Sequence, residues 1–207
     1  MIRILIIDDH PVVRIGVRRI LEEGISFLET DEAGDAREAM KRIRGNTYNL
    51  ILLDINLPGK SGMVLLEDLR NMIPELPVLM LSMYPEKDYA LRALKLGAAG
   101  YLTKNSLDEE LIKAVNRILD GHKYISESLA EALIDHSGND QPPHARLSNR
   151  EFEIMIKISQ GESMKEIADI LSISEKTVST YKTRILEKLQ CTTTADLIRY
   201  ALKAGLV

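Results

Sequence analysis

Several polar residues that can bind metal ions or phosphoryl groups stand directly after aliphatic runs of the chain. Asp8 and Asp9 follow residues 2–7, Asp54 follows 49–53, Ser82 follows 77–81 and Lys104 follows 99–103. Carboxylates bind hard divalent cations and can attack a phosphoryl donor. An ammonium and a hydroxyl can contact the oxygens of the transferred group. What this set could do therefore depends on whether the fold brings its members together.

The chain up to residue 120 alternates between strand-like apolar runs and helical patterns. The expected strands are residues 2–7, 27–33, 49–53, 77–81 and 99–103, and the expected helices are 11–23, 36–44, 62–73, 86–96 and 107–120. This alternation predicts an α/β fold, a flavodoxin-like doubly wound sheet of five parallel strands in the order 2-1-3-4-5. The third and fourth runs are almost wholly aliphatic, which indicates that helices cover both faces of the sheet.

In such a sheet, ligands bind beyond the carboxyl ends of the strands, at the point where the strand order reverses. The polar residues at the strand ends should therefore converge on one site. Carboxylates packed together repel each other, and a bound Mg²⁺ would relieve this repulsion. One carboxylate could then attack a phosphoryl donor while Lys104 and Ser82 neutralise or hydrogen-bond the phosphoryl oxygens.

These motifs closely resemble those of the receiver domain of response regulators over about 120 residues. The matching segments are Ile-Ile-Asp-Asp-His-Pro (6–11), Leu-Leu-Asp-Ile-Asn-Leu-Pro-Gly (52–59), Leu-Ser (81–82) and Gly-Ala-Ala-Gly-Tyr-Leu-Thr-Lys (97–104). Each polar residue alone has an ordinary explanation, such as a solvated turn or a surface lysine. Their joint order and spacing favour the functional interpretation.

The resemblance implies a role for each residue of the site. Asp54 would be the phosphoacceptor, with Ser82 and Lys104 contacting the phosphoryl group, Ser82 also taking part in the switch, and Tyr101 as the switch aromatic. Asp9, Asp54 and the backbone carbonyl of Asn56 would bind Mg²⁺, and Asp8 would bind it through water. Asn105 departs from the family, because many receivers have a cis proline after the lysine. The family's geometry for the loop after Lys104 is therefore not transferred to this chain.

Residues 122–146 are expected to join the receiver, residues 1–121, to a second domain, residues 147–207. One helix is expected at 126–136, and the segment from Ser137 to His144 has the composition of a linker. Pro11 suits a first helical turn. Capping boxes, in which the residue at a helix start and an acid three residues later exchange hydrogen bonds with the backbone, are expected at Asp35/Glu38, Ser106/Glu109, Ser148/Glu151 and Ser163/Glu166.

The second domain is expected to be all-helical, with helices at 148–160, 163–171, 174–189 and 193–204. Residues 163–189 predict a helix, a short turn and a second helix. The inner face of the second helix is apolar and its outer face is basic and rich in hydroxyls. Such a helix fits the major groove of DNA, with lysines and arginines on phosphates and hydroxyls at base edges. Periodicity alone favours an ordinary amphipathic helix pair over a DNA-binding one.

The segments 147–151, 160–168 and 174–189 are similar to the LuxR-type domain of the NarL/FixJ family, and TVSTYKTR is especially similar to its BvgA/EvgA-like branch. This resemblance implies a four-helix helix-turn-helix domain that binds DNA, and a last helix that completes the core or forms a dimer surface. The expected DNA-facing residues are Lys165, Lys176, Thr177, Ser179, Thr180, Lys182, Thr183 and Arg184.

The two resemblances together imply a two-component response regulator rather than a dedicated enzyme. A sensor histidine kinase would phosphorylate Asp54, and the phosphorylated homodimer would bind double-stranded operator DNA, with RNA polymerase as a further partner. One alternative is an aspartyl-phosphate hydrolase of the haloacid-dehalogenase type, but that class requires an acid where Asn56 stands, and the chain has no cap domain. Another alternative is a receiver with a protein-binding helical output.

Composition agrees with a two-domain protein in the cytoplasm. Net charge is −4, and residues 147–207 hold nine Lys or Arg and eight Asp or Glu, so DNA binding must rest on a local stripe. No basic leader precedes the first acids, and no apolar run approaches the roughly 20 residues of a membrane span.

The single cysteine, Cys191, excludes an internal disulfide. The four histidines lack ligand spacing and are expected at the surface.

Overall fold

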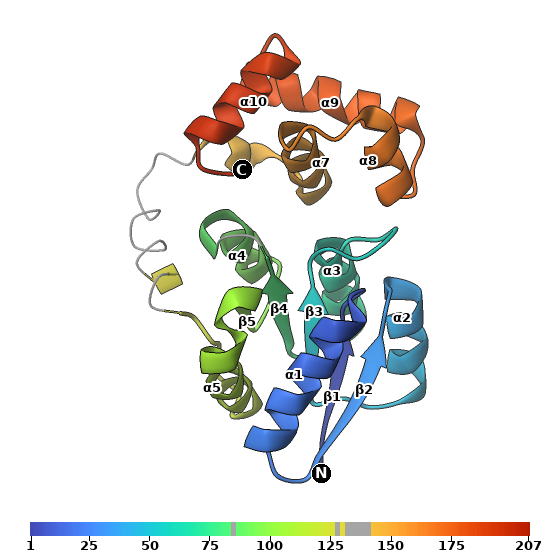
Figure 1. Cartoon of the computed structure of the whole chain (residues 1–207), viewed down its shortest axis with the longest axis vertical. Coiled ribbons are helices and arrows are strands. Elements are labelled where there is room, and N and C mark those ends of the chain that lie inside the picture. The colour runs from blue at the N-terminus through green and yellow to red at the C-terminus, as the bar shows by residue number, and fades with distance from the viewer. Residues whose placement is uncertain (84–85, 127–128, 131–141) are drawn as a thin grey trace. The chain divides into compact units, whose positions relative to one another are not determined.

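A computed structural model describes residues 1–83, 86–126, 129–130 and 142–207 of the chain (Figure 1). The chain divides into two units, Met1–Asp135 and His136–Val207. The helix expected at 126–136 and the linker sequence at 137–144 lie largely outside the described residues. No described helix has both the length and the apolar character that a membrane span requires.

The first unit alternates strands and helices along the chain, as predicted. Its elements are β1 (Ile2–Ile7), α1 (Pro11–Gly24), β2 (Leu28–Ala33), α2 (Ala36–Gly45), β3 (Leu50–Asp54), α3 (Gly62–Met72), β4 (Val78–Ser82), α4 (Glu86–Lys95), β5 (Gly100–Thr103), the 3-10 turn η1 (Lys104–Ser106) and α5 (Leu107–Leu119). Among the described residues, the strands form one five-stranded sheet in the order β2-β1-β3-β4-β5, with every neighbouring pair parallel. The predicted doubly wound topology is confirmed.

Aliphatic side chains are buried on both faces of the sheet. On one face, Ile4 and Leu52 pack in a cluster with Val17 of α1 and Leu111 of α5. Leu53, the next residue along β3, points to the opposite face and is also fully buried. Helices therefore cover both sides of the sheet, and its polar groups are left at the ends of the strands.

The second unit is built from helices around an apolar core. Its elements are the 3-10 turn η2 (Pro143–Arg146), α7 (Asn149–Ser159), α8 (Met164–Ile170), α9 (Glu175–Leu189) and α10 (Thr194–Lys203). Buried side chains from each α-helix meet in the interior: Phe152, Ile156, Ile167, Val178, Ile185 and Leu197. The predicted helices are all present, with ends that differ by at most one residue.

Most of the predicted helix starts are found. Ser148 and Ser163 form complete capping boxes with Glu151 and Glu166. Asp35 accepts from the backbone N–H of Glu38, but the Glu38 carboxylate accepts from the backbone N–H of Gly34 rather than from that of Asp35.

The expected box at Ser106 is wrong. The turn η1 precedes α5 there, and the Ser106 hydroxyl donates to the carbonyl of Thr103. The Ser106 side chain accepts no hydrogen bond from the first turn of α5. A further capping box, at Thr193 and Asp196, was not predicted.

Candidate phosphoacceptor pocket and DNA-binding helix

Acidic side chains meet where β1 and β3, adjacent strands of the sheet, both end. Asp8, Asp9, His10 and Asp54 each offer a ligand atom, and these atoms lie within 4.8 Å of one another. Asp8 and Asp54 are buried, whereas Asp9 and His10 are exposed. The convergence of three carboxylates that was predicted from the strand ends is therefore present.

Lys104 enters the same pocket from the end of β5. Its Nζ lies 2.6 Å from Oδ2 of Asp8 and 2.9 Å from Oδ2 of Asp54. Burial lowers the pKa of Lys104, but its hydrogen bonds and ion pairs with the two aspartates outweigh burial and raise the pKa above its usual value. Lys104 is therefore a fixed cation beside the carboxylate that is expected to receive the phosphoryl group.

The Asp54 carboxyl group holds its proton more tightly than an ordinary aspartate. Burial raises its pKa to about 6, and the neighbouring Asp8 carboxylate contributes in the same direction. Lys104 and the backbone N–H of Asn56 act in the opposite direction but do not cancel this effect. A bound divalent cation would favour the ionised form and lower this pKa.

One oxygen of Asp54 lacks a partner. Among the described residues, buried Oδ1 of Asp54 has no hydrogen-bond partner, although Oδ2 binds Lys104. A buried carboxylate oxygen without a partner is costly unless a ligand satisfies it. The oxygen-rich donor set fits Mg²⁺, which typically takes one or two carboxylates and keeps several waters.

The remaining predicted pocket residues occupy the expected strands and loop. Ser82 is the last residue of β4 and is fully buried, and Asn56 lies two residues beyond Asp54 and is half-buried. Tyr101 lies on β5 opposite Met80 and has no exposed surface. A hydroxyl, a loop backbone and an aromatic side chain thus lie on elements that border the pocket or lead into it.

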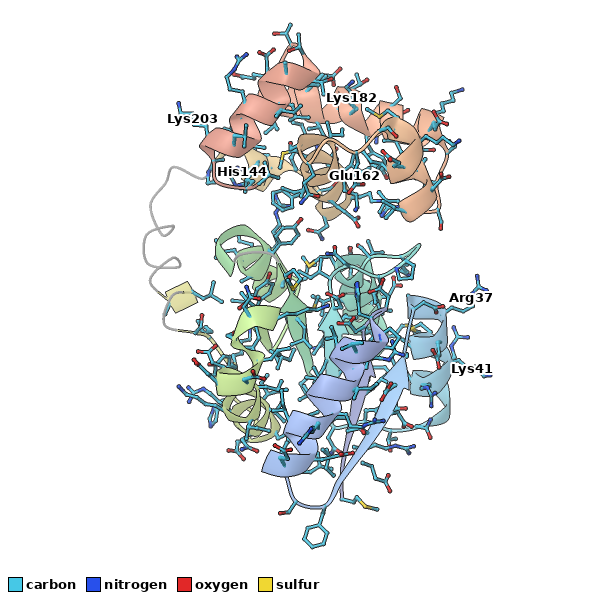
Figure 2. All side chains as sticks on the ribbon, in the orientation of Figure 1. Arg37, Lys41, His144, Glu162, Lys182 and Lys203 are labelled. Carbon is cyan, nitrogen blue, oxygen red and sulfur yellow. The ribbon has the colours of Figure 1, made fainter. Side chains whose placement is uncertain are left out.

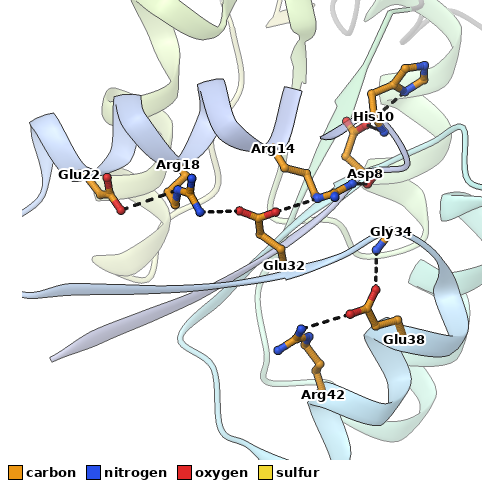
Figure 3. A network of polar contacts seen from close by, with 9 residues as sticks. All are labelled: Asp8, His10, Arg14, Arg18, Glu22, Glu32, Gly34, Glu38 and Arg42. Atoms are coloured by element: carbon orange, nitrogen blue, oxygen red, sulfur yellow. Dashed lines mark hydrogen bonds and ion pairs between the residues drawn. The ribbon is translucent and has the colours of Figure 1, made fainter. Parts of the chain in front are cut away.

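His10 was not predicted to take part in the site. Its ring Nδ1 lies 2.6 Å from Oδ1 of Asp9. The same atom lies 3.3 Å from Oδ1 of Asp8 (Figure 3). Its place directly after the two acids was the available signal. His144 differs from the expectation in another way, because it is buried and its Nδ1 lies 2.7 Å from the Tyr200 hydroxyl.

Gly62 allows α3 to begin directly against the backbone of the expected phosphoacceptor. A Cβ atom at this position would lie 1.9 Å from the carbonyl oxygen of Asp54, a distance that no side chain can adopt. The N–H of Gly62 donates to the carbonyl of Ile55 at 2.8 Å. Any side chain here would displace either the start of α3 or the backbone of Asp54.

The helix pair α8–α9 has the two-faced character that the sequence predicted. Val178, Ile185 and Leu189 bury the inner face of α9. The outer face carries exposed Lys176, Ser179, Thr180, Thr183 and Arg184. Lys182 and Thr177 are half-buried on the same helix, and Lys165 is exposed on α8 (Figure 2 labels Lys182). A basic, hydroxyl-rich face on a helix packed from behind is suited to the DNA major groove.

Hydroxyl groups on α9 also make local hydrogen bonds. The Thr180 hydroxyl donates to the carbonyl of Lys176 at 2.9 Å, and the Thr183 hydroxyl donates to the carbonyl of Ser179 at 3.2 Å. Thr177 has a second role, because Ser174 caps the helix by accepting from the Thr177 backbone N–H at 3.1 Å.

The comparisons with known proteins agree with both halves of this description. Residues 4–116 match the family model of the response regulator receiver domain, and residues 145–201 match that of bacterial regulatory proteins of the luxR family. Transcriptional activator protein ExaE of Pseudomonas putida is 38% identical, over 99% of this chain and 97% of ExaE. Oxygen regulatory protein NreC of Staphylococcus carnosus is 36% identical, over 99% of each chain.

A solved structure is also similar over almost the whole chain. RcsB from Salmonella enterica serovar Typhimurium, bound to promoter DNA in the presence of a phosphomimetic, is 27% identical with a TM-score of 0.63. The match covers 96% of this chain and 97% of RcsB.

These matches and the fold define a two-component response regulator, in which a receiver domain is joined to a DNA-binding, LuxR-type domain that regulates transcription. The chain belongs to the NarL/FixJ family of response regulators.

Proposed function

We propose that Asp54 accepts a phosphoryl group from a sensor histidine kinase. The observation that carries this proposal is the buried Asp54 carboxylate, with one unpartnered oxygen and with Lys104 bound to the other. The free oxygen would attack phosphorus as the bond between phosphorus and the donor's nitrogen breaks. Lys104 and Ser82 would contact the phosphoryl oxygens, and positioning of this kind accounts for most of catalysis in phosphoryl transfer.

The acidic residues would hold Mg²⁺ beside Asp54. Asp9, Asp54 and the Asn56 backbone carbonyl are the proposed direct ligands, and Asp8 the ligand through water. When bound, Mg²⁺ would neutralise developing charge on the phosphoryl oxygens. Beyond accepting and losing this group, we propose no dedicated enzymatic role for the chain.

Phosphorylation would shift the population of receiver conformations. The added phosphoryl group brings roughly one to two negative charges to the end of β3, and Ser82 and Lys104 can move toward them. Tyr101 is the proposed aromatic of the switch and is already buried in this structure. The switch would change either the surface around Tyr101 or the surface formed by α1 and α5, and either of these could form the homodimer.

The dimer would place two copies of α9 on operator DNA. Half-sites about one helical turn, roughly 34 Å, apart would match a twofold dimer. We infer that residues 1–121 accept the phosphoryl group, that residues 147–207 bind DNA, and that residues 122–146 link these two domains. We place the protein in the cytoplasm. RNA polymerase is a further proposed partner. The proposed DNA contacts are Lys165, Lys176, Thr177, Ser179, Thr180, Lys182, Thr183 and Arg184.

A small-molecule phosphodonor with Mg²⁺ tests the proposal on the whole chain. We expect one added phosphoryl group and a larger dimer fraction by native mass spectrometry, and tighter binding in a DNA-shift assay. Asp54→Asn should abolish labelling because an amide is a poor nucleophile, whereas Asp108→Asn, at an exposed acid of α5, should retain it. Undiminished labelling of Asp54→Asn would move the phosphoacceptor elsewhere. Labelling without tighter DNA binding would favour a protein-binding output.

A further inference from the structure

Asp8 directly follows β1, and both of its backbone polar groups form hydrogen bonds with other elements. The Asp8 N–H donates to the carbonyl of Ala33 on β2 at 3.1 Å. The Asp8 carbonyl accepts from Nη1 of Arg14, one turn into α1, at 2.7 Å. This carbonyl belongs to the rigid peptide unit that connects Asp8 to Asp9. Arg14 therefore fixes the orientation of the peptide between two carboxylates of the acidic pocket.

Arg14 is itself held in place by β2. Its Nε donates to Oε2 of Glu32 at 2.9 Å, and the other oxygen of Glu32 accepts from Nη1 of Arg18, also at 2.9 Å (Figure 3). The Arg14 side chain is only 16% exposed, compared with 41% for Arg18. Glu32 precedes Ala33, so consecutive residues of β2 hold both sides of the Asp8 backbone.

The charges of this network suit a neighbouring cation site. An arginine near a divalent cation would weaken binding if its charge were uncompensated. Here Glu32 pairs with Arg14, and the guanidinium contacts a backbone carbonyl rather than the Asp8 or Asp9 carboxylate. Arg14 can thus orient the acidic pair without neutralising either acid.

We propose that Arg14, oriented by Glu32, is a positioning residue that sets the divalent-cation affinity of the Asp8–Asp9 pair. The inference rests on the Mg²⁺ site of the proposed function. Partners that orient metal ligands from outside the coordination sphere typically contribute 10–100-fold to metal affinity or activity. Arg14 reaches Asp9 through the shared peptide bond, so its effect belongs at the lower end of that range.

The matched pair of variants is Arg14→Met and Arg18→Met in the full chain. Each removes an arginine that binds Glu32 at the same distance, but only Arg14 contacts Asp8. Titration of Mg²⁺ by calorimetry, without a phosphodonor, should give about tenfold weaker binding for Arg14→Met. Binding by Arg18→Met should stay within about twofold of the parent, since the pair it loses is partly exposed. Equal affinities of the two variants would overturn the proposal.

Hydrogen exchange on the metal-free protein gives a second readout. The His10 N–H donates to Oδ1 of Asp8 at 2.8 Å and reports the order of this turn. We expect it to exchange faster in Arg14→Met than in Arg18→Met, and equal exchange rates would contradict the proposal.

Two further outcomes have defined meanings. If Arg14→Met does not fold, Glu32→Gln replaces it, and parent-like Mg²⁺ affinity in that variant would overturn the inference. Absence of Mg²⁺ binding by the parent would instead overturn the proposed cation site on which the inference rests.

Discussion

Glu151 in the first turn of α7 and Lys188 in the last turn of α9 form an ion pair, with 2.6 Å between Oε2 and Nζ. Glu151 is buried, and burial raises the pKa of its carboxyl, but the hydrogen bonds from Lys188 and Ser148 outweigh this and lower it. Arg150, the preceding residue, donates to the carbonyl of Leu171 at the end of α8. The first turn of α7 therefore binds the C-terminal ends of α8 and α9, the two helices of the DNA-binding pair.

Replacing Lys188 should weaken this arrangement. We expect Lys188→Met to lower the free energy of unfolding of the second unit by about 1–2 kcal/mol, because it leaves a buried carboxylate without its cation. This loss is smaller than the loss expected for a fully buried ion pair, because the Lys188 side chain is 41% exposed. Urea unfolding at pH 7 measures the loss. The control is Arg199→Met, which removes a solvent-exposed ion pair with Asp196 and should lower the free energy of unfolding much less than Lys188→Met. Equal losses of unfolding free energy in the two variants would show that the Glu151–Lys188 pair stabilises the second unit no more than an exposed pair does.

The raised pKa of Asp54 predicts how stability depends on pH in the metal-free protein. Because the folded carboxyl binds its proton more tightly than the unfolded one, its contribution is fully present below about pH 4 and is lost as pH rises through about 6. Asp54→Asn lacks this group. Its stability relative to the parent should therefore rise by about 2 kcal/mol between pH 4 and pH 7.5, as urea unfolding in a chelator can measure. A difference that does not change with pH would refute a raised pKa.

Removing an acid from the pocket should impair metal binding but not folding. We expect Asp9→Ala to bind Mg²⁺ more weakly and to accept phosphate from a small-molecule donor more slowly. The thermal midpoint of the metal-free variant should equal or exceed that of the parent, since one carboxylate has left a repulsive cluster. Calorimetric titration and a thermal melt provide the two measurements. A large drop in the metal-free melting temperature would make Asp9 a structural residue instead.

Two substitutions on α9 should have different effects on DNA binding. Lys182→Ala should weaken binding about equally for all sequences and reduce the salt dependence, as expected for a phosphate contact. Thr180→Ala should alter the preference among operators by about 1–3 kcal/mol at one base position. Binding of the phosphorylated protein over a salt series separates these effects. Parent-like behaviour of both variants would mean that α9 is not the reading helix. Neither substitution should change labelling of Asp54.

The meeting of Asp8, Asp54 and Lys104 could be predicted, because a polar residue that follows an apolar run lies at the carboxyl end of its strand, and these ends share one edge of a parallel sheet. The strand order could be predicted because 2-1-3-4-5 is a common order of doubly wound sheets. Contacts that depend on side-chain direction in three dimensions were not predicted. Arg14 reaches the Asp8 carbonyl from the next helix, and no local periodicity encodes that bond.

The local errors have local causes. Ser106 was expected to cap α5, but η1 occupies the connection between β5 and α5 and turns the serine away. The box at Thr193 and Asp196 follows the same spacing rule as the boxes that were found and could have been predicted.

The threonine hydroxyls of α9 bear on which bases this protein can distinguish. Thr180 and Thr183 already donate their hydrogens to carbonyls of their own helix, so the lone pairs of each oxygen are what remain for a partner outside. In the major groove, an acceptor is matched by the exocyclic amino groups of adenine and cytosine, whereas guanine and thymine present keto oxygens. If Thr180 and Thr183 contact bases as proposed, we expect exchange between adenine and cytosine at those positions to be tolerated and replacement by a keto base to be penalised.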